Sequence, residues 1–224
     1  MNTRRRWLAV VAASGLLATA CSTPVASAPS PRSDATSLGP AASGSGSPSG
    51  GFDAAAAEQY CTDQGGMLVD RVATWNTNAD PSSWLQLAGR ATFCEFEMGE
   101  GDTTTRISVD LVTLYSKEPT LAGVAYLSKV PPTLPPEPSA NPADYNCSQG
   151  LGGSATFGSG QSGGGWVDAS QPVFVVMDMC AFEDFSAIDA FGILYYSQGT
   201  VRGADLATKM RYQPNGKLPA IFGS

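Results

Sequence analysis

Histidine is absent from this 224-residue chain, and charged residues make up only 15% of it. Without histidine the chain cannot build a Ser-His-Asp or Cys-His catalytic set, a histidine-ligated zinc site or an imidazole pH switch. Its 13 basic residues are outnumbered by 20 acidic ones, for a net charge of −7. Nucleic-acid backbones bind to basic surfaces, so we expect no nucleic-acid partner. The sequence also has no apolar run long enough to span a bilayer.

The N-terminus has the pattern of an export signal. A basic segment, an apolar stretch at residues 7–17 and small residues just before Cys21 predict a signal peptide over residues 1–20. The segment 17–21 resembles a bacterial lipoprotein box, in which the cysteine is acylated, with palmitate among its acyl chains. Cysteine number favours this interpretation, because lipidation of Cys21 leaves four of the five cysteines to pair. The signal leaves Sec and twin-arginine export as alternatives.

Lipidation would place the protein on the extracytoplasmic face of the bacterial cell membrane, attached through its N-terminal lipid only. Removal of residues 1–20 leaves 10 basic and 20 acidic residues, a net charge of −10, which disfavours binding to anionic head groups. Residues 21–52 consist mostly of Ser, Ala, Pro and Gly and are predicted to be a disordered tether. The expected partner is an envelope protein, glycan or lipid of unknown identity.

Two cysteine pairs show an internal repeat. Cys61 and Cys94 are separated by the same number of residues as Cys147 and Cys180, and similar residues flank each pair. Self-similarity over about eighty residues indicates a duplicated domain rather than a solenoid of short units. Equal spacing favours the bonds Cys61–Cys94 and Cys147–Cys180 among the three possible pairings.

The predicted fold is α+β, a tandem duplication in which each copy has a three-stranded antiparallel sheet, flanking helices and one disulfide. The domain boundaries are copy one at 53–130, a Pro-rich linker at 131–140 and copy two at 141–224. Periodicity and turn residues predict the elements within the copies. These are helices at 53–64 and 119–129, and strands at 67–74, 86–97, 106–116, 173–182 and 190–197.

The first cysteine segment resembles a known kind of domain. Residues 60–66, with the pattern Tyr-Cys-x-x-x-Gly-Gly, are followed by Cys94-x-Phe96. This pattern resembles a small exported bacterial domain of unknown function that carries a haemolysin label. The resemblance covers about a third of each copy and rests on few positions. It implies an exported, cysteine-containing domain and no established activity.

One carboxylate stands inside the most apolar run of the chain. Asp178 lies in the predicted strand 173–182, where a carboxylate must be hydrogen-bonded or its pKa rises. Because no complete catalytic set is found, we expect a non-enzymatic binding or interaction module without a cofactor. The alternative is a cell-envelope hydrolase that uses carboxylates of copy two, namely Asp178, Glu183 and Asp184.

Two further groups of side chains are candidates for binding. The tryptophans of the predicted loops can form an aromatic patch or cap the small cores; they are Trp75, Trp84 and Trp166. Four acidic residues gather at and after a strand end, at Glu95, Glu97, Glu100 and Asp102. A solvated acidic loop is favoured over a calcium site there, because Ca²⁺ needs six or more oxygen ligands. We therefore expect no metal.

Overall fold

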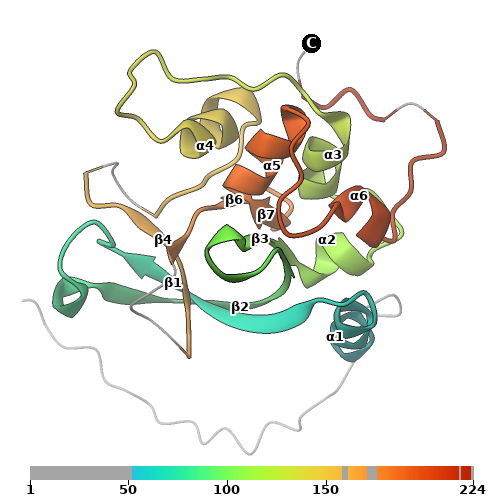
Figure 1. The fold of residues 1–224 in the computed structure, drawn as a ribbon, viewed down its shortest axis with the longest axis horizontal. Coiled ribbons are helices and arrows are strands. Elements are labelled where there is room, and N and C mark those ends of the chain that lie inside the picture. The colour runs from blue at the N-terminus through green and yellow to red at the C-terminus, as the bar shows by residue number, and fades with distance from the viewer. Residues whose placement is uncertain (1–51, 158–160, 171–175, 217, 223–224) are drawn as a thin grey trace, which may run out of the picture. The chain divides into compact units, whose positions relative to one another are not determined.

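The computed structural model describes residues 52–157, 161–170, 176–216 and 218–222 (Figure 1). The predicted signal peptide, Cys21 and nearly all of the predicted tether lie outside the described residues, as do positions 173–175 of one predicted strand. The described residues of both predicted copies belong to one compact unit. None of the described helices has the length and apolar content needed to cross a bilayer.

The chain of the folded unit begins as the sequence predicts. Helix α1 (Ala54–Asp63) starts at Asp53, whose Oδ1 accepts a hydrogen bond from the Ala56 amide at 3.0 Å. Strands β1 (Met67–Trp75) and β2 (Leu85–Met98) follow and pair antiparallel. These three elements confirm the prediction, because capping and alternation are local signals.

The predicted strand 106–116 is wrong beyond its first half. Strand β3 ends at Asp110 (Thr105–Asp110), and helix α2 (Leu111–Tyr115) begins directly after it. The Asp110 carboxylate accepts hydrogen bonds from the amide and the hydroxyl of Thr113, at 2.9 and 2.5 Å. This cap starts a helix in a segment whose β-branched residues favour a strand.

The predicted strand 190–197 is wrong for the same reason. The segment forms helix α5 (Ala190–Ser197), and the Oδ1 of Asp189 accepts a hydrogen bond from the Gly192 amide at 3.1 Å. The predicted helix at 119–129 is present as α3 (Leu121–Ser128), with Thr120 as its cap. The other elements are η1 (Pro81–Ser83), η2 (Gly101–Thr103), α4 (Pro142–Tyr145), the π-helical turn η3 (Asn146–Gly150), β4 (Gly164–Asp168), β5 (Val176–Met177), β6 (Met179–Ala181), β7 (Ala187–Asp189) and α6 (Leu206–Lys209).

Within the described residues, seven strands form one antiparallel sheet with the order β5-β4-β1-β2-β3-β7-β6. Strands β5 and β6 stand at opposite ends of this order, yet only Asp178 separates them in the sequence. The sheet therefore curls until its two ends meet. The Oγ of Ser108 on β3 lies 3.3 Å from the Sδ of Met177 on β5, a contact across the interior of the closed sheet.

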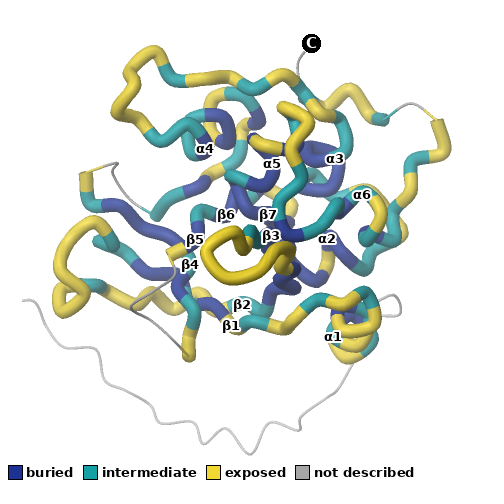
Figure 2. Tube along the Cα trace, viewed as in Figure 1, coloured by how far each residue is buried: buried dark blue, intermediate teal, exposed yellow. Residues whose placement is uncertain are grey.

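The buried hydrophobic residues form two clusters. One lies inside the curled sheet and is called the inner core, and the other packs between the sheet and the helices and is called the outer core. The inner cluster centres on Phe93, Met177, Met179 and Ala187. Beside it the guanidinium of Arg71 pairs with the carboxylate of Glu95, and both side chains are at most 5% exposed. Helices α2, α3, α5 and α6 gather beside β3 and β7 and cover the outer core (Figures 1 and 2).

Both disulfides join a helical segment to a strand in the outer core, as predicted. Cys61 of α1 is bonded to Cys94 of β2, and Cys147 of η3 is bonded to Cys180 of β6, each at a separation of 33 residues. All four cysteines are at most 1% exposed. The fold is thus α+β, with a mostly antiparallel sheet and two disulfides.

Candidate functional site

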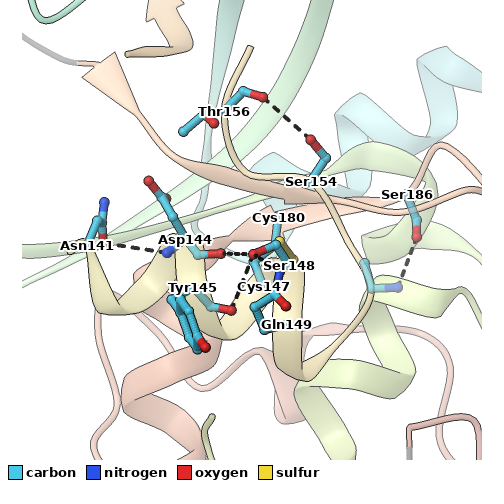
Figure 3. The surroundings of a disulfide bond; sticks show 11 residues. Asn141, Asp144, Tyr145, Cys147, Ser148, Gln149, Ser154, Thr156, Cys180 and Ser186 are labelled. Carbon is cyan, nitrogen blue, oxygen red and sulfur yellow. Dashed lines mark hydrogen bonds between the residues drawn. A yellow bond between two sulfur atoms is a disulfide. The ribbon is translucent and has the colours of Figure 1, made fainter. Parts of the chain in front are cut away.

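A cavity of about 740 Å³ lies beside α4 and the junction of β5 with β6. Its lining includes Asn141, Asp144 and Ser148 from the α4–η3 segment and Asp178 from the junction. Figure 3 shows the α4–η3 side chains beside the Cys147–Cys180 disulfide. The disulfide therefore ties the helical wall of the cavity to the sheet.

Asn141 joins the two carboxylates of the cavity. Its Oδ1 caps α4 by accepting a hydrogen bond from the Ala143 amide at 3.0 Å. Its side-chain amide donates to the Oδ2 of Asp178 at 3.0 Å. Because the cap fixes which end of the amide is the acceptor, the donor end must point to Asp178. One asparagine thus starts the helix that carries Asp144 and holds Asp178 in place.

The close approach of β4 to β5 shapes the opposite wall. Gly165 on β4 lies so near that a Cβ there would stand 2.9 Å from the Met177 carbonyl oxygen and 3.5 Å from the Oδ1 of Asp178. A larger residue would push the strands apart. Asp178 itself interrupts the strand, and its carbonyl accepts a hydrogen bond from the Ala190 amide at 2.7 Å.

The two carboxyl groups have raised pKa values. Burial, with a smaller contribution from the charge of Asp178, raises the pKa of Asp144 to about 7. Burial also raises the pKa of Asp178, and the hydrogen bond from Asn141 opposes that rise. The Oδ1 of Asp144 is buried and has no hydrogen-bond partner among the described residues. Such an acceptor is costly unless something else binds to it.

The lining residues carry acidic and neutral polar groups. Among the described lining residues no lysine or arginine is found, and hydroxyl groups come from Thr77, Ser139, Tyr145, Ser148, Ser154 and Thr156. A cavity of this charge repels an anion when its carboxyl groups are ionised. It suits a ligand that is rich in hydrogen-bond donors or positively charged.

The structure separates the three carboxylates that the sequence grouped. Asp178 lines the cavity, but Glu183 and Asp184 lie in the exposed β6–β7 turn. Asp184 accepts hydrogen bonds from the amides of Ser186 and Leu121, at 3.1 and 2.8 Å, so it holds the turn against α3. Sequence reasoning missed Asp144, the carboxylate that does stand near Asp178. Its signal was its place three residues before Cys147, which matches Glu58 three residues before Cys61.

The three candidate tryptophans have different surroundings. Trp166 packs edge-on against Phe93, with ring centroids 5.3 Å apart, and belongs to the inner core. Trp84 is half-buried and donates its indole N–H to the carbonyl of Ala79 at 3.0 Å. Trp75 is half-buried at the end of β1. Trp166 and Trp84 thus have structural partners of their own.

The acidic group at the end of β2 is also divided. Glu95 faces the inner core, where it pairs with Arg71 and accepts a hydrogen bond from Ser108 at 2.7 Å. Glu97, Glu100 and Asp102 are exposed. Within the described part of the chain, no three carboxylate or cysteine side chains gather as metal ligands.

Comparison with known proteins adds no relative. No protein-family model, no curated protein and no solved structure matches this chain. The resemblance of the cysteine segments to the haemolysin-labelled domain stays a prediction.

Proposed function

We propose that the protein is an extracytoplasmic lipoprotein, anchored through Cys21, whose folded unit binds a small polar ligand that carries an ammonium group. The ligand would enter the cavity of Asp144 and Asp178 and leave unchanged. The observation that carries this proposal is the side chain of Asp144, which lines a cavity together with a second carboxylate and whose buried Oδ1 has no partner among the described residues. An ammonium group donates three hydrogen bonds and offsets the negative charge of both carboxylates.

The proposal includes a tandem duplication, which several matched contacts support. Gly66 and Gly153 pack directly against the two disulfides, since a Cβ at either glycine would stand less than 3 Å from a cysteine sulfur. Their amides donate to the carbonyls of Cys61 and Cys147, at 3.0 and 2.9 Å. In this proposal the two halves form one domain, because their strands share one sheet. Strand β1 of the first half pairs with β4 of the second, and β3 of the first half pairs with β7 of the second.

The proposed duplication favours copy two as the functional half. Asp144 and Asp178 correspond by their spacing from the cysteines to Glu58 and Thr92. Those two residues line a separate cavity of about 710 Å³. Only the copy-two cavity has a carboxylate at both matched positions. The copy-one cavity supplies a matched control, because the same kind of substitution there should leave binding unchanged.

Calorimetric titration of the full-length protein in detergent with glucosamine, glucose and gluconate tests the proposal. The three probes share hydroxyl groups and differ in charge. We expect glucosamine to bind about tenfold tighter than glucose, because its ammonium group adds one charge-assisted hydrogen bond to a carboxylate. We expect gluconate not to bind. Asp144→Asn should remove that preference, and Glu58→Gln should keep it. Equal binding of glucosamine and glucose, or a preference that survives Asp144→Asn, would contradict the proposal.

A second function is favoured by the unequal environments of the two carboxyl groups. A carboxyl group with a pKa near 7 beside another carboxylate is the usual arrangement of a general acid and base. In a cell-envelope hydrolase, Asp144 would donate the proton and Asp178 would activate water, in place of the pair of Asp178 with Glu183 or Asp184. Release of reducing ends from a cell-wall polymer, lost in Asp178→Asn, would support the hydrolase over the binding module.

A further inference from the structure

A third, smaller cavity is lined by residues of β3, β5, β7 and α5. Its volume is about 200 Å³, and its lining includes Arg106, Arg202, Asp189 and the apolar side chains of Met177 and Phe191. Pockets for drug-sized ligands begin near 300 Å³. This cavity therefore suits a molecule of only a few heavy atoms.

Opposite charges face this cavity without forming an ion pair. Asp189 is 4% exposed, and Arg202 contributes to the same lining. In the described part of the chain these two side chains have no ion pair within 4.0 Å, and the buried Nε of Arg202 has no hydrogen-bond partner. Asp189 accepts a hydrogen bond from the Gly192 amide at 3.1 Å, but in the described part of the chain no side-chain cation forms an ion pair with it. Charged groups in a buried site are costly unless they are paired, so a ligand with both signs of charge would give Asp189 and Arg202 a charged partner each.

Both arginines are held in place, Arg202 by aromatic rings and Arg106 by an ion pair with Glu95. The Arg202 guanidinium lies over the rings of Phe191 and Tyr195, at 5.9 and 5.2 Å from their centroids. The Nη1 of Arg106 is 3.8 Å from the Oε1 of Glu95, too far for a hydrogen bond. Stacking leaves the edge of a guanidinium available, and that edge matches the geometry of a carboxylate.

We propose that this cavity is a binding site for a small zwitterion of the α-amino acid class. Arg202 and Arg106 bind its carboxylate, Asp189 binds its ammonium group, and Met177 and Phe191 contact its carbon atoms. The site differs from the cavity of Asp144, although Val176 and Asp178 contribute to the lining of both.

The test uses the full-length protein in detergent. All proteins in this test carry Asp144→Asn, which removes the proposed preference of the first cavity for an ammonium group. Calorimetric titrations compare alanine with ethylamine, which lacks the carboxylate, and with propionate, which lacks the amine. We expect alanine to bind at least about tenfold tighter than either, since each probe loses one charged contact. Arg202→Gln should weaken alanine binding to a similar degree. Arg90→Gln, at an exposed arginine outside this cavity, should leave it unchanged.

Asp189→Asn keeps the proposal testable if Arg202→Gln fails to fold, because asparagine caps a helix as well as aspartate does. This variant should retain cooperative unfolding and lose the preference for alanine over propionate. Alanine binding that is no tighter than that of ethylamine and propionate, or that survives both substitutions, would overturn the proposal. Glucosamine binding in the protein with Asp144 intact is measured separately, so failure at one cavity does not decide the other.

Discussion

Asp110 and Asp189 cap the helices that follow two strands paired with each other in the closed sheet. Each comes directly after a residue of the pair Val109–Ile188. The Asp110 carboxylate accepts a hydrogen bond from the Thr113 amide, and the Asp189 carboxylate accepts one from the Gly192 amide. Both side chains are at most 9% exposed, and burial raises the pKa of both.

Substitution of these two aspartates should have unequal effects on stability. Asp110 also accepts a hydrogen bond from the Ala187 amide at 2.6 Å, so Asp110→Ala leaves a buried amide unpaired as well as removing a cap. We expect Asp110→Ala to lower the free energy of unfolding by about 2–4 kcal/mol. Asp189→Ala, which removes mainly the cap, should cost about 1–2 kcal/mol. Urea unfolding followed by circular dichroism measures both, and equal losses would show that the Ala187 contact contributes little.

Asp144 should make stability fall as the pH rises. Its pKa is about 7 in the folded protein, against about 3.9 in an unfolded chain. Between these values the folded state keeps a proton that the unfolded state has released, so the contribution of this group is full below about pH 4 and is lost by about pH 7. We therefore expect the stability of the protein relative to Asp144→Asn to decline across this range.

Denaturant unfolding at several pH values measures that difference. The exposed Glu118→Gln is the control and should give a parallel curve to the unsubstituted protein. A difference between Asp144→Asn and the unsubstituted protein that is constant from pH 4 to pH 8 would mean that Asp144 titrates normally.

The two disulfides should contribute equally to stability. Both close loops with a sequence separation of 33 residues. Loop entropy predicts a loss of roughly 3–4 kcal/mol for replacement of either pair by alanine. Thermal unfolding of the two double variants, Cys61→Ala with Cys94→Ala and Cys147→Ala with Cys180→Ala, measures this. A much larger loss for one pair would show that its cysteines contribute through packing beyond the loop closure.

Cys21 should decide where the protein is found in the cell. If this cysteine is acylated, labelled palmitate is incorporated into the protein and the protein sediments with membranes. Cys21→Ser should abolish the label and release the protein, because its net charge disfavours attachment to anionic lipids. Ala20→Ser, which changes a neighbouring small residue, is the matched control. Membrane attachment that survives Cys21→Ser would show another mode of anchoring.

Part of the candidate site was predictable. Asp178 stood out as a carboxylate in an apolar run, and the structure places it in a cavity. Its neighbour Asp144 was not predicted, because 34 positions separate the two in the sequence. The hydrogen bond from Asn141 and the disulfide at Cys147 hold α4 beside the β5–β6 junction.

The sequence by itself determined the features that depend on local or counted signals. Cysteine spacing predicted both disulfides, and the helix predicted at 53–64 is present as α1. The caps Asp110 and Asp189 are local signals too, but the strand-favouring composition of segments 111–115 and 190–197 concealed the helices that they start. Tertiary structure decided the rest. The closed sheet, and with it the placement of charges at both cavities, arose from pairing between strands far apart in the chain, which local patterns do not encode.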